Sequence, residues 1–243
     1  MYRALDTGSY YDRVEEPSKV KAARAVSDLS SVLRGGAQIV DLGCGGGHLL
    51  RAVRDADQPW SATGYDLDPG SVELCRKAGL SATSDLAALP QADAVTMLDV
   101  AEHVKDPRAF FSQAHDLLKP GGILYLHTPR RCIWDTTALK ILRVPLLRAL
   151  SAMWLGTRVS WYHQRLWTDR ALDRMVADSG FVVIERRQEM ELSWPIDAYI
   201  DTYVKKKFRA PAIVQRGAHM IGKTVVRFRL LRNKAIVMSR RME

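Results

Sequence analysis

Short apolar runs alternate along the chain with stretches whose hydrophobic residues recur at helical spacing. The apolar runs predict buried strands over residues 38–42, 61–66, 92–99, 123–128, 181–186 and 235–239. The intervening stretches predict helices over residues 48–56, 71–78, 108–118 and 168–179. Strands and helices that alternate at this spacing indicate βαβ units, and therefore a parallel sheet covered by helices on both faces.

Three segments extend beyond this minimal α/β pattern of a single domain over residues 1–243. Residues 1–37 are expected to form an N-terminal helical lid or cap, and residues 131–165 a helical insertion rich in Leu and Trp. That insertion is either a helix packed on the body or a lid over an apolar substrate. The third segment, residues 195–231, contains a basic amphipathic helix, with Arg216, Lys223 and Arg227 opposite the apolar face.

Composition places the chain among globular proteins with a sizeable core. Of its 243 residues 47% are hydrophobic and 26% charged, which excludes disordered, collagenous and disulfide-rich classes. Three cysteines are too few and too scattered for a disulfide framework or a C-x-x-C metal site, so we expect a reducing compartment. Without an apolar signal core or a run of about 18–20 apolar residues, a cytoplasmic protein is expected, with peripheral membrane association left open.

The positive charge is concentrated in one part of the chain. The net charge is +9, and residues 201–243 hold twelve Lys or Arg and only two acids, which leaves a net −1 on the first 200 residues. Such asymmetry favours a local docking surface over a nucleic-acid cleft. Residues 205–232 either lie on an anionic membrane or simply pack on the body in contact with solvent; a nucleic-acid partner is not expected.

Acidic residues stand at three successive strand ends, the first of them beside a glycine-rich loop. Asp41 precedes the loop at residues 43–47, which lacks the third glycine of a dinucleotide motif because His48 stands there. A carboxylate at that position can receive an ammonium group. Asp66 suits a pair of ribose hydroxyls, and Asp85 suits an exocyclic amine. The order predicts a ligand with an amino acid end, a ribose and an adenine.

With these residues in view, the sequence resembles the class I S-adenosylmethionine-dependent methyltransferases over roughly residues 10–190. The motifs that carry the resemblance are D-L-G-C-G-G-G, G-Y-D-L-D, S-D-L-A-A-L-P, L-D-V-A-E-H-V-K-D-P and L-L-K-P-G-G-I-L-Y-L-H-T-P. The resemblance implies a Rossmann-like, doubly wound α/β fold with a seven-stranded sheet, mostly parallel, and helical insertions. Residues 235–239 would be its one antiparallel strand, beside residues 181–186.

The same resemblance implies S-adenosylmethionine as cofactor and S-adenosylhomocysteine as product. It puts the glycine loop under the methionine moiety. Independently of the resemblance, Cys44 within the loop is expected to be a small packing residue rather than a nucleophile. The cofactor-binding residues that we expect are Asp41, Gly43, Cys44, Gly45, Gly47, Asp66, Leu67, Ser84, Asp85, Leu86, Leu98, Asp99 and Val100.

The segment L-D-V-A-E-H-V is also similar to a motif of the ubiquinone-biosynthesis O-methyltransferases, in which the matching acid, Glu and His have been associated with a divalent metal. Because the first acid here is Asp99 rather than Glu, we predict no metal site, with Asp99, Glu102 and His103 as the alternative ligand set. His103 and His163 are the candidate catalytic bases. Alternatively, His103 orients its loop, and His163 is an exposed or capping residue.

The predicted activity is methylation of a hydroxyl group on an apolar or lipid-linked small molecule. Three alternatives remain open. The acceptor could be a soluble sugar or polyketide, or it could be RNA or protein held by the basic tail. The chain could also be a non-catalytic, membrane-recruited module that binds the cofactor without turnover.

Overall fold

The computed structural model describes residues 7–132, 135–137, 140, 164–191, 212–227 and 232–242. The chain forms two compact units. One comprises Met1–Pro129, Trp161–Arg187 and Ala235–Glu243, and the other comprises Arg130–Ser160 and Gln188–Lys234. The predicted insertion at residues 131–165 falls largely outside the described residues, so its role as a lid stays a prediction.

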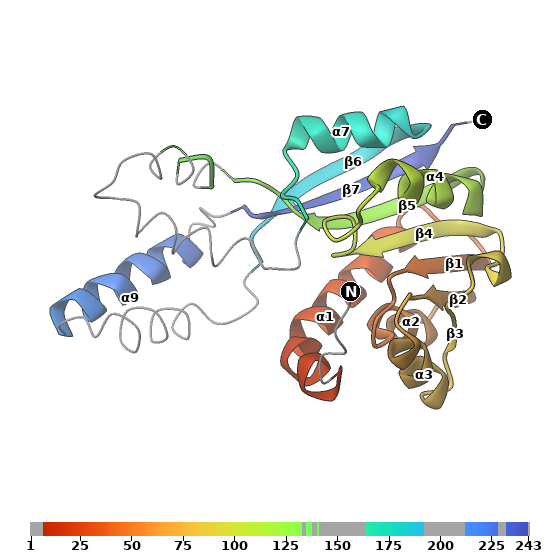
Figure 1. The fold of residues 1–243 in the computed structure, drawn as a ribbon, viewed down its shortest axis with the longest axis horizontal. Helices are drawn as coiled ribbons and strands as arrows, with labels where there is room; N and C mark the ends of the chain where they lie inside the picture. Colours follow the sequence, from red (N-terminus) through yellow and green to blue (C-terminus); the bar gives the residue numbers. More distant parts are fainter. Residues whose placement is uncertain are drawn as a thin grey trace. The chain divides into compact units, whose positions relative to one another are not determined.

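A seven-stranded sheet has the order β3-β2-β1-β4-β5-β7-β6. Neighbouring strands among β1 to β5 pair in parallel, while β7 runs opposite to β5 and β6 (Figure 1). The predicted α/β class and the position of the last strand are therefore confirmed. The strands are β1 Ala37–Leu42, β2 Trp60–Tyr65, β3 Ser81–Thr83, β4 Ala92–Leu98, β5 Leu118–Pro129, β6 Phe181–Glu189 and β7 Lys234–Arg241.

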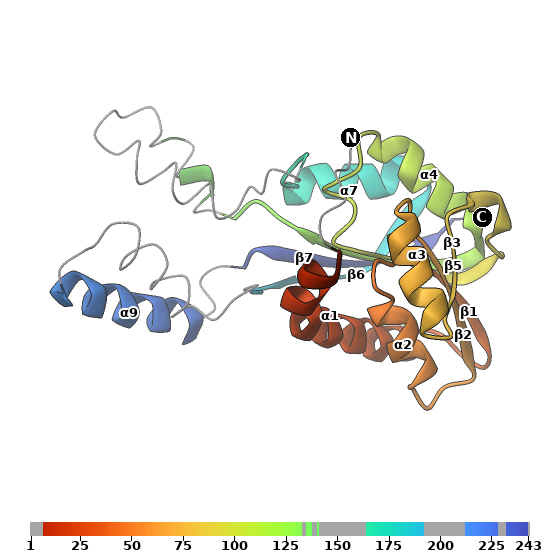
Figure 2. The same ribbon diagram turned by 60° about the horizontal axis from the view of Figure 1, so that its bottom comes forward.

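Helices cover both faces of the sheet. Helices α1 (Thr7–Ser30) and α2 (His48–Arg54) lie on one face, and α4 (Pro107–Leu117) and α7 (Asp169–Asp178) on the other (Figure 2). Helix α3 (Pro69–Lys77) packs near β3, and the short 3-10 helix η1 spans Leu86–Ala88. In the other unit, α9 (Ala212–Arg227) contains most of the predicted amphipathic helix. No helix in the described part of the chain is long and apolar enough to cross a membrane.

Each face of the sheet has a hydrophobic core between the strands and the helices that cover that face. Both cores arise because successive side chains of a strand point to opposite faces. In β7, Ile236 and Met238 pack with α1 and α2, while Ala235 and Val237 pack with α4 and α7. All four side chains are at most 2% exposed. This strand is therefore buried on both faces, as its unbroken apolar sequence predicts.

Most predicted elements begin and end within two residues of their observed bounds, with β5 as the main exception. We predict a strand from residue 123, but β5 begins at Leu118, which pairs with Ala92. The register then shifts so that Ala94 pairs with Ile123, and Gly121 has a φ of +74°. Pro120, Gly121 and Gly122, which precede the predicted strand, therefore form an irregularity inside the observed one.

Candidate functional site

The glycine loop between β1 and α2 has a backbone that other residues rarely adopt. Gly43, Gly45 and Gly47 have φ values of +81°, +48° and +77°. A Cβ atom on Gly43 would lie 2.4 Å from Cγ2 of Val100, and one on Gly47 would lie 2.9 Å from Sγ of Cys75. The loop therefore needs glycine both for its left-handed conformation and for the close approach of its neighbours.

Cys44 belongs to this packing. Its thiol is 6% exposed, and the hydrogen bond with the Cys75 thiol together with burial raises the pKa of Cys44. A Cβ atom on Gly64 of β2 would lie 2.6 Å from Cys44 Sγ. Strand β2 therefore leaves room for the sulfur only because residue 64 is glycine. A buried thiol with a raised pKa suits a packing residue rather than a nucleophile.

Asp41 is a buried acid at the carboxyl end of β1. It is 3% exposed, and the Thr96 hydroxyl donates a 2.6 Å hydrogen bond to its Oδ1. Burial raises the pKa of Asp41 to about 7, and the negative charge of Asp66 adds to this rise, whereas the Thr96 bond opposes it. A carboxylate in such surroundings gains strongly from a cationic partner, and the ammonium group of an amino acid can supply one.

Asp66 holds the loop in place from the end of β2. Its Oδ2 accepts the Gly45 N–H at 2.9 Å, and its Oδ1 accepts the Asp68 N–H at 2.9 Å. Burial raises the pKa of Asp66, and the two backbone bonds oppose that rise. A carboxylate has about four acceptor positions, so these bonds leave capacity for a pair of hydroxyls such as those of a ribose.

The third predicted acid, Asp85, lies at the end of β3 and caps η1. Its side chain accepts the Ala87 N–H at 3.0 Å, and both Asp85 and Ser84 are exposed. Leu86 is half-buried, and Leu67, just after β2, is 72% exposed. The exposed side chain of Leu67 offers apolar surface to the flat face of a ring.

At the end of β4, Asp99 adopts a strained backbone and a fixed side chain. Its φ of +56° is the one positive value recorded for a non-glycine residue in the described part of the chain. Its Oδ1 lies 3.0 Å from Nδ1 of His127, and its Oδ2 makes an ion pair with Lys21 of α1. Leu98 precedes it in the strand, and Val100 follows it against Gly43.

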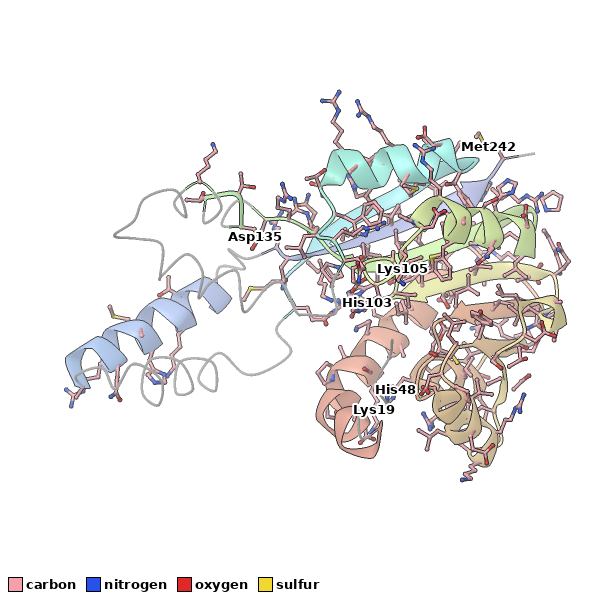
Figure 3. All side chains as sticks on the ribbon, in the orientation of Figure 1. Lys19, His48, His103, Lys105, Asp135 and Met242 are labelled. Carbon is pink, nitrogen blue, oxygen red and sulfur yellow. The ribbon has the colours of Figure 1, made fainter. Side chains whose placement is uncertain are left out.

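The turn after Asp99 brings Glu102 and His103 to the same edge. Glu102 is fully buried, and its Oε2 accepts the Thr128 hydroxyl at 3.0 Å. The His103 side chain is 29% exposed, with Nε2 3.9 Å from Oε1 of Glu102, and its backbone N–H bonds to the carbonyl of Val100. Figure 3 shows His103 beyond the arrowhead of β4.

His163, the other candidate base, lies outside the described residues. The next residue in sequence, Gln164, donates its backbone N–H to the carbonyl of Glu102 at 2.8 Å. Arg165 then donates to the carbonyl of Lys105 at 3.1 Å. The segment that follows His163 is thus attached to the turn that carries His103.

From the sequence we do not identify Lys21 as a partner of Asp99, or Thr96 and Thr128 as hydrogen-bond donors to Asp41 and Glu102. The signal for Lys21 is its place beside the buried stripe of α1 that includes Ala22 and Ala25, because a lysine at the edge of such a stripe needs an acidic partner. The two threonines lie inside apolar strands and carry no comparable signal. Among the described residues, no three His, Cys, Asp or Glu side chains are grouped so that they could hold a metal ion.

Comparison with known proteins identifies the family to which the chain is similar. A family model described as a methyltransferase domain matches residues 15–186. A ubiquinone biosynthesis O-methyltransferase of Xylella fastidiosa is 37% identical over an alignment of 110 positions, which covers 40% of this chain and 44% of that protein. The chain therefore spans under half the length of the curated relatives that it matches.

Solved structures show the same fold at low sequence identity. A methyltransferase in complex with the Trm112 methyltransferase activator of Haloferax volcanii has a TM-score of 0.62 at 21% identity, covering 98% of this chain and 94% of that chain. Magnesium protoporphyrin IX methyltransferase of Synechocystis PCC 6803, with bound SAH, has a TM-score of 0.60 at 15% identity, covering 95% and 86%.

The family match covers most of the sheet and every strand end described above. The buried Asp41, the bare backbone of the glycine loop and the carboxyl group of Asp66 form an arrangement that fits the amino acid and ribose parts of S-adenosylmethionine. The chain therefore belongs to the methyltransferase domain family, and it has the fold of the class I S-adenosylmethionine-dependent methyltransferases.

Proposed function

We propose that the chain transfers the methyl group of S-adenosylmethionine to a hydroxyl oxygen on an apolar or lipid-linked small molecule. The sulfonium supplies an electrophilic methyl group with a neutral leaving group. The acceptor oxygen forms a bond to the methyl carbon as the carbon–sulfur bond breaks, and the hydroxyl proton passes to a histidine. The products are a methyl ether and S-adenosylhomocysteine. The protein's contribution is positioning, exclusion of water and removal of that proton.

The position of His103 carries this proposal. Val100 contacts the glycine loop, and the His103 N–H bonds to the Val100 carbonyl at 2.9 Å. The backbone of His103 is therefore held in a turn whose first residue, Val100, packs against the glycine loop, and its imidazole is partly exposed. Histidine titrates near physiological pH and can accept a proton there. His163 is the second candidate, and the attachment of Gln164 to Glu102 supports its placement at the same edge.

The names of related proteins support an apolar acceptor. The Xylella fastidiosa relative is named for ubiquinone biosynthesis, and the Synechocystis enzyme for magnesium protoporphyrin IX. Both names refer to large, largely apolar molecules. Neither name refers to RNA or protein as the acceptor.

The proposal is tested by incubating the purified protein with methyl-labelled S-adenosylmethionine and separate lipid, polar, RNA and protein fractions of a cell extract. We expect label in the lipid fraction, released from an oxygen by ether cleavage. Label confined to another fraction would replace this acceptor class by the class found there. Cofactor binding without label in any fraction would favour a non-catalytic module.

For the basic segment, we propose that α9 lies on an anionic membrane surface. Arg216 and Lys223 are exposed on the described helix, and Met220 is 67% exposed. Basic residues beside an exposed apolar side chain are typical of helices that bind at a bilayer interface. An enzyme with a lipid-linked acceptor would gain from such contact, because the acceptor is concentrated in the membrane.

The membrane proposal is tested with the variant Arg216→Glu, Lys223→Glu, Arg227→Glu and sedimentation with phosphatidylserine vesicles. We expect binding by the unmodified protein that falls with added salt and at least tenfold weaker binding by the variant. A control variant, Arg54→Glu, Lys77→Glu, Arg108→Glu, makes the same charge change on exposed helices of the other unit. Equal loss in both variants would refute a role specific to α9.

A further inference from the structure

Lys21, Asp99 and His127 form a polar cluster at the carboxyl edge of the sheet. Lys21 of α1 makes an ion pair with Oδ2 of Asp99, and Nδ1 of His127 lies 3.0 Å from Oδ1 of the same residue. The side chains are 13%, 23% and 2% exposed, respectively. Three elements that are distant in sequence, namely α1, the end of β4 and β5, thus meet at one carboxylate.

The backbone of Asp99 is fixed as well. Its N–H donates a 2.8 Å hydrogen bond to the carbonyl of His127, and its φ of +56° is rarely adopted by residues with a side chain. Such backbone strain persists only where the surrounding structure enforces it, and it is concentrated at functional sites. Both carboxylate oxygens and the backbone N–H of Asp99 are therefore held by named partners.

These contacts do not fit a divalent metal at the residues that the family resemblance suggests. Asp99 presents its oxygens to Lys21 and His127, and Glu102 presents Oε2 to the Thr128 hydroxyl. A hard cation such as Mg²⁺ or Mn²⁺ requires several oxygen ligands directed at one point. A lysine ammonium at Asp99 would also repel a second cation at that carboxylate.

We propose that Lys21 is the resident cation of this site. Its ammonium group stands at Asp99 in place of a divalent metal, so methyl transfer by this chain needs no such metal. Lys21 is a positioning residue, because it acts through Asp99 and fixes the strand end that precedes Val100 and His103. The statement about catalysis rests on the proposed function, whereas the statement about metal binding does not.

Removal of Lys21 has a definite electrostatic consequence. Asp99 would remain largely buried without that positive partner, and an uncompensated buried charge is strongly unfavourable. The carboxylate of Asp99 would then attract another cation from solution. The double variant Lys21→Met, Asp99→Asn removes both charges, so it provides a well-folded reference if Lys21→Met alone proves unstable.

The first experiment measures Mn²⁺ binding by electron paramagnetic resonance, without any methyl acceptor. We expect no Asp99-dependent binding by the unmodified protein, at least tenfold tighter binding by Lys21→Met, and loss of that gain in Lys21→Met, Asp99→Asn. Lys19→Met is the matched control, since Lys19 lies on the same helix, is 54% exposed and pairs with Glu15 and Glu16. Stoichiometric Mn²⁺ binding by the unmodified protein that Asp99→Asn abolishes would overturn the proposal, as would equal behaviour of Lys21→Met and Lys19→Met.

The second experiment uses turnover with an identified acceptor. We expect a chelator to leave kcat unchanged within twofold, and Lys21→Met to lower kcat at least tenfold while cofactor affinity by calorimetry changes less than threefold. Lys21→Arg should restore part of kcat, because it restores the positive charge. Loss of kcat on chelation, restored by Mg²⁺, would overturn the proposal. If no acceptor is ever labelled, the proposed function fails, and the Mn²⁺ measurement still decides the role of Lys21.

Discussion

The carboxyl group of Asp41 is buried beside the glycine loop, where the hydroxyl of Thr96 is its neutral hydrogen-bond donor. Its pKa is about 7 in the folded protein against an ordinary value of 3.8. The folded state therefore holds a proton between these values that the unfolded state has lost. It follows that the contribution of Asp41 to the free energy of unfolding falls as pH rises from about 4 to about 7, and is constant above.

Replacement of Asp41 by Asn should remove this pH dependence of the free energy of unfolding, and it should weaken cofactor binding. Without cofactor, we expect Asp41→Asn to be more stable than the unmodified protein at pH 8, by at most about 4 kcal/mol, and no more stable at pH 4. Affinity for S-adenosylmethionine should fall about tenfold or more, because the charge-assisted bond to its ammonium group is lost. Thermal unfolding at both pH values and calorimetry check these outcomes. Unchanged affinity would show that the ammonium group binds elsewhere.

Gly43 illustrates how two requirements meet at one position. Gly43→Ala places a Cβ atom 2.4 Å from Val100 Cγ2 and adds left-handed strain, whereas Gly35→Ala, at a φ of +65°, adds only the strain because nothing lies within 4 Å. We expect Gly35→Ala to cost about 1–2 kcal/mol of stability with no effect on the cofactor. Gly43→Ala should cost more and reduce cofactor affinity, as measured by urea unfolding and calorimetry. Equal effects of the two variants would contradict the close approach at Gly43.

At the level of elements, the sequence predicts six of the seven strands, and the central strands β1, β4 and β7 are clearest because they are largely buried and mostly apolar. Strand β3 is only three residues long and is not predicted from the hydrophobic pattern. The acids at the ends of β1, β2 and β3 are also predictable, since parallel strands bring their carboxyl ends to one edge. Contacts between distant elements are not predictable in the same way. The pairing of Lys21 with Asp99 depends on how α1 packs, and the shift of register in β5 depends on which residue Ala92 meets.

The buried side chains of β7 should contribute measurably to the free energy of unfolding. Ile236 is 2% exposed and packs in the core that α1 and α2 form with the sheet. We expect Ile236→Ala to lower the free energy of unfolding by about 2–5 kcal/mol, because it removes buried methyl groups and leaves a cavity. Met242→Ala, just beyond the strand and 46% exposed, should change it by less than about 0.5 kcal/mol. Urea unfolding measures both, and equal values would contradict the burial of β7.

On the scale of the whole molecule, the excess positive charge and the candidate site residues lie in different parts of the sequence. The candidate site residues precede position 165, whereas all of the excess positive charge follows position 200. Substitutions that alter vesicle binding should therefore leave cofactor affinity unchanged. This separation allows the membrane proposal and the methyl-transfer proposal to be tested separately.

The order of strands also constrains how the nascent protein can fold during synthesis. Strand β7 lies between β5 and β6, yet it is made after both of them. While residues 234–241 are still inside the ribosome, β6 has no place next to β5, and that side of the sheet remains an open edge. Completion of the sheet must await the translation of more than a hundred further residues after β5, so the edge of β5 lacks its native partner throughout this interval.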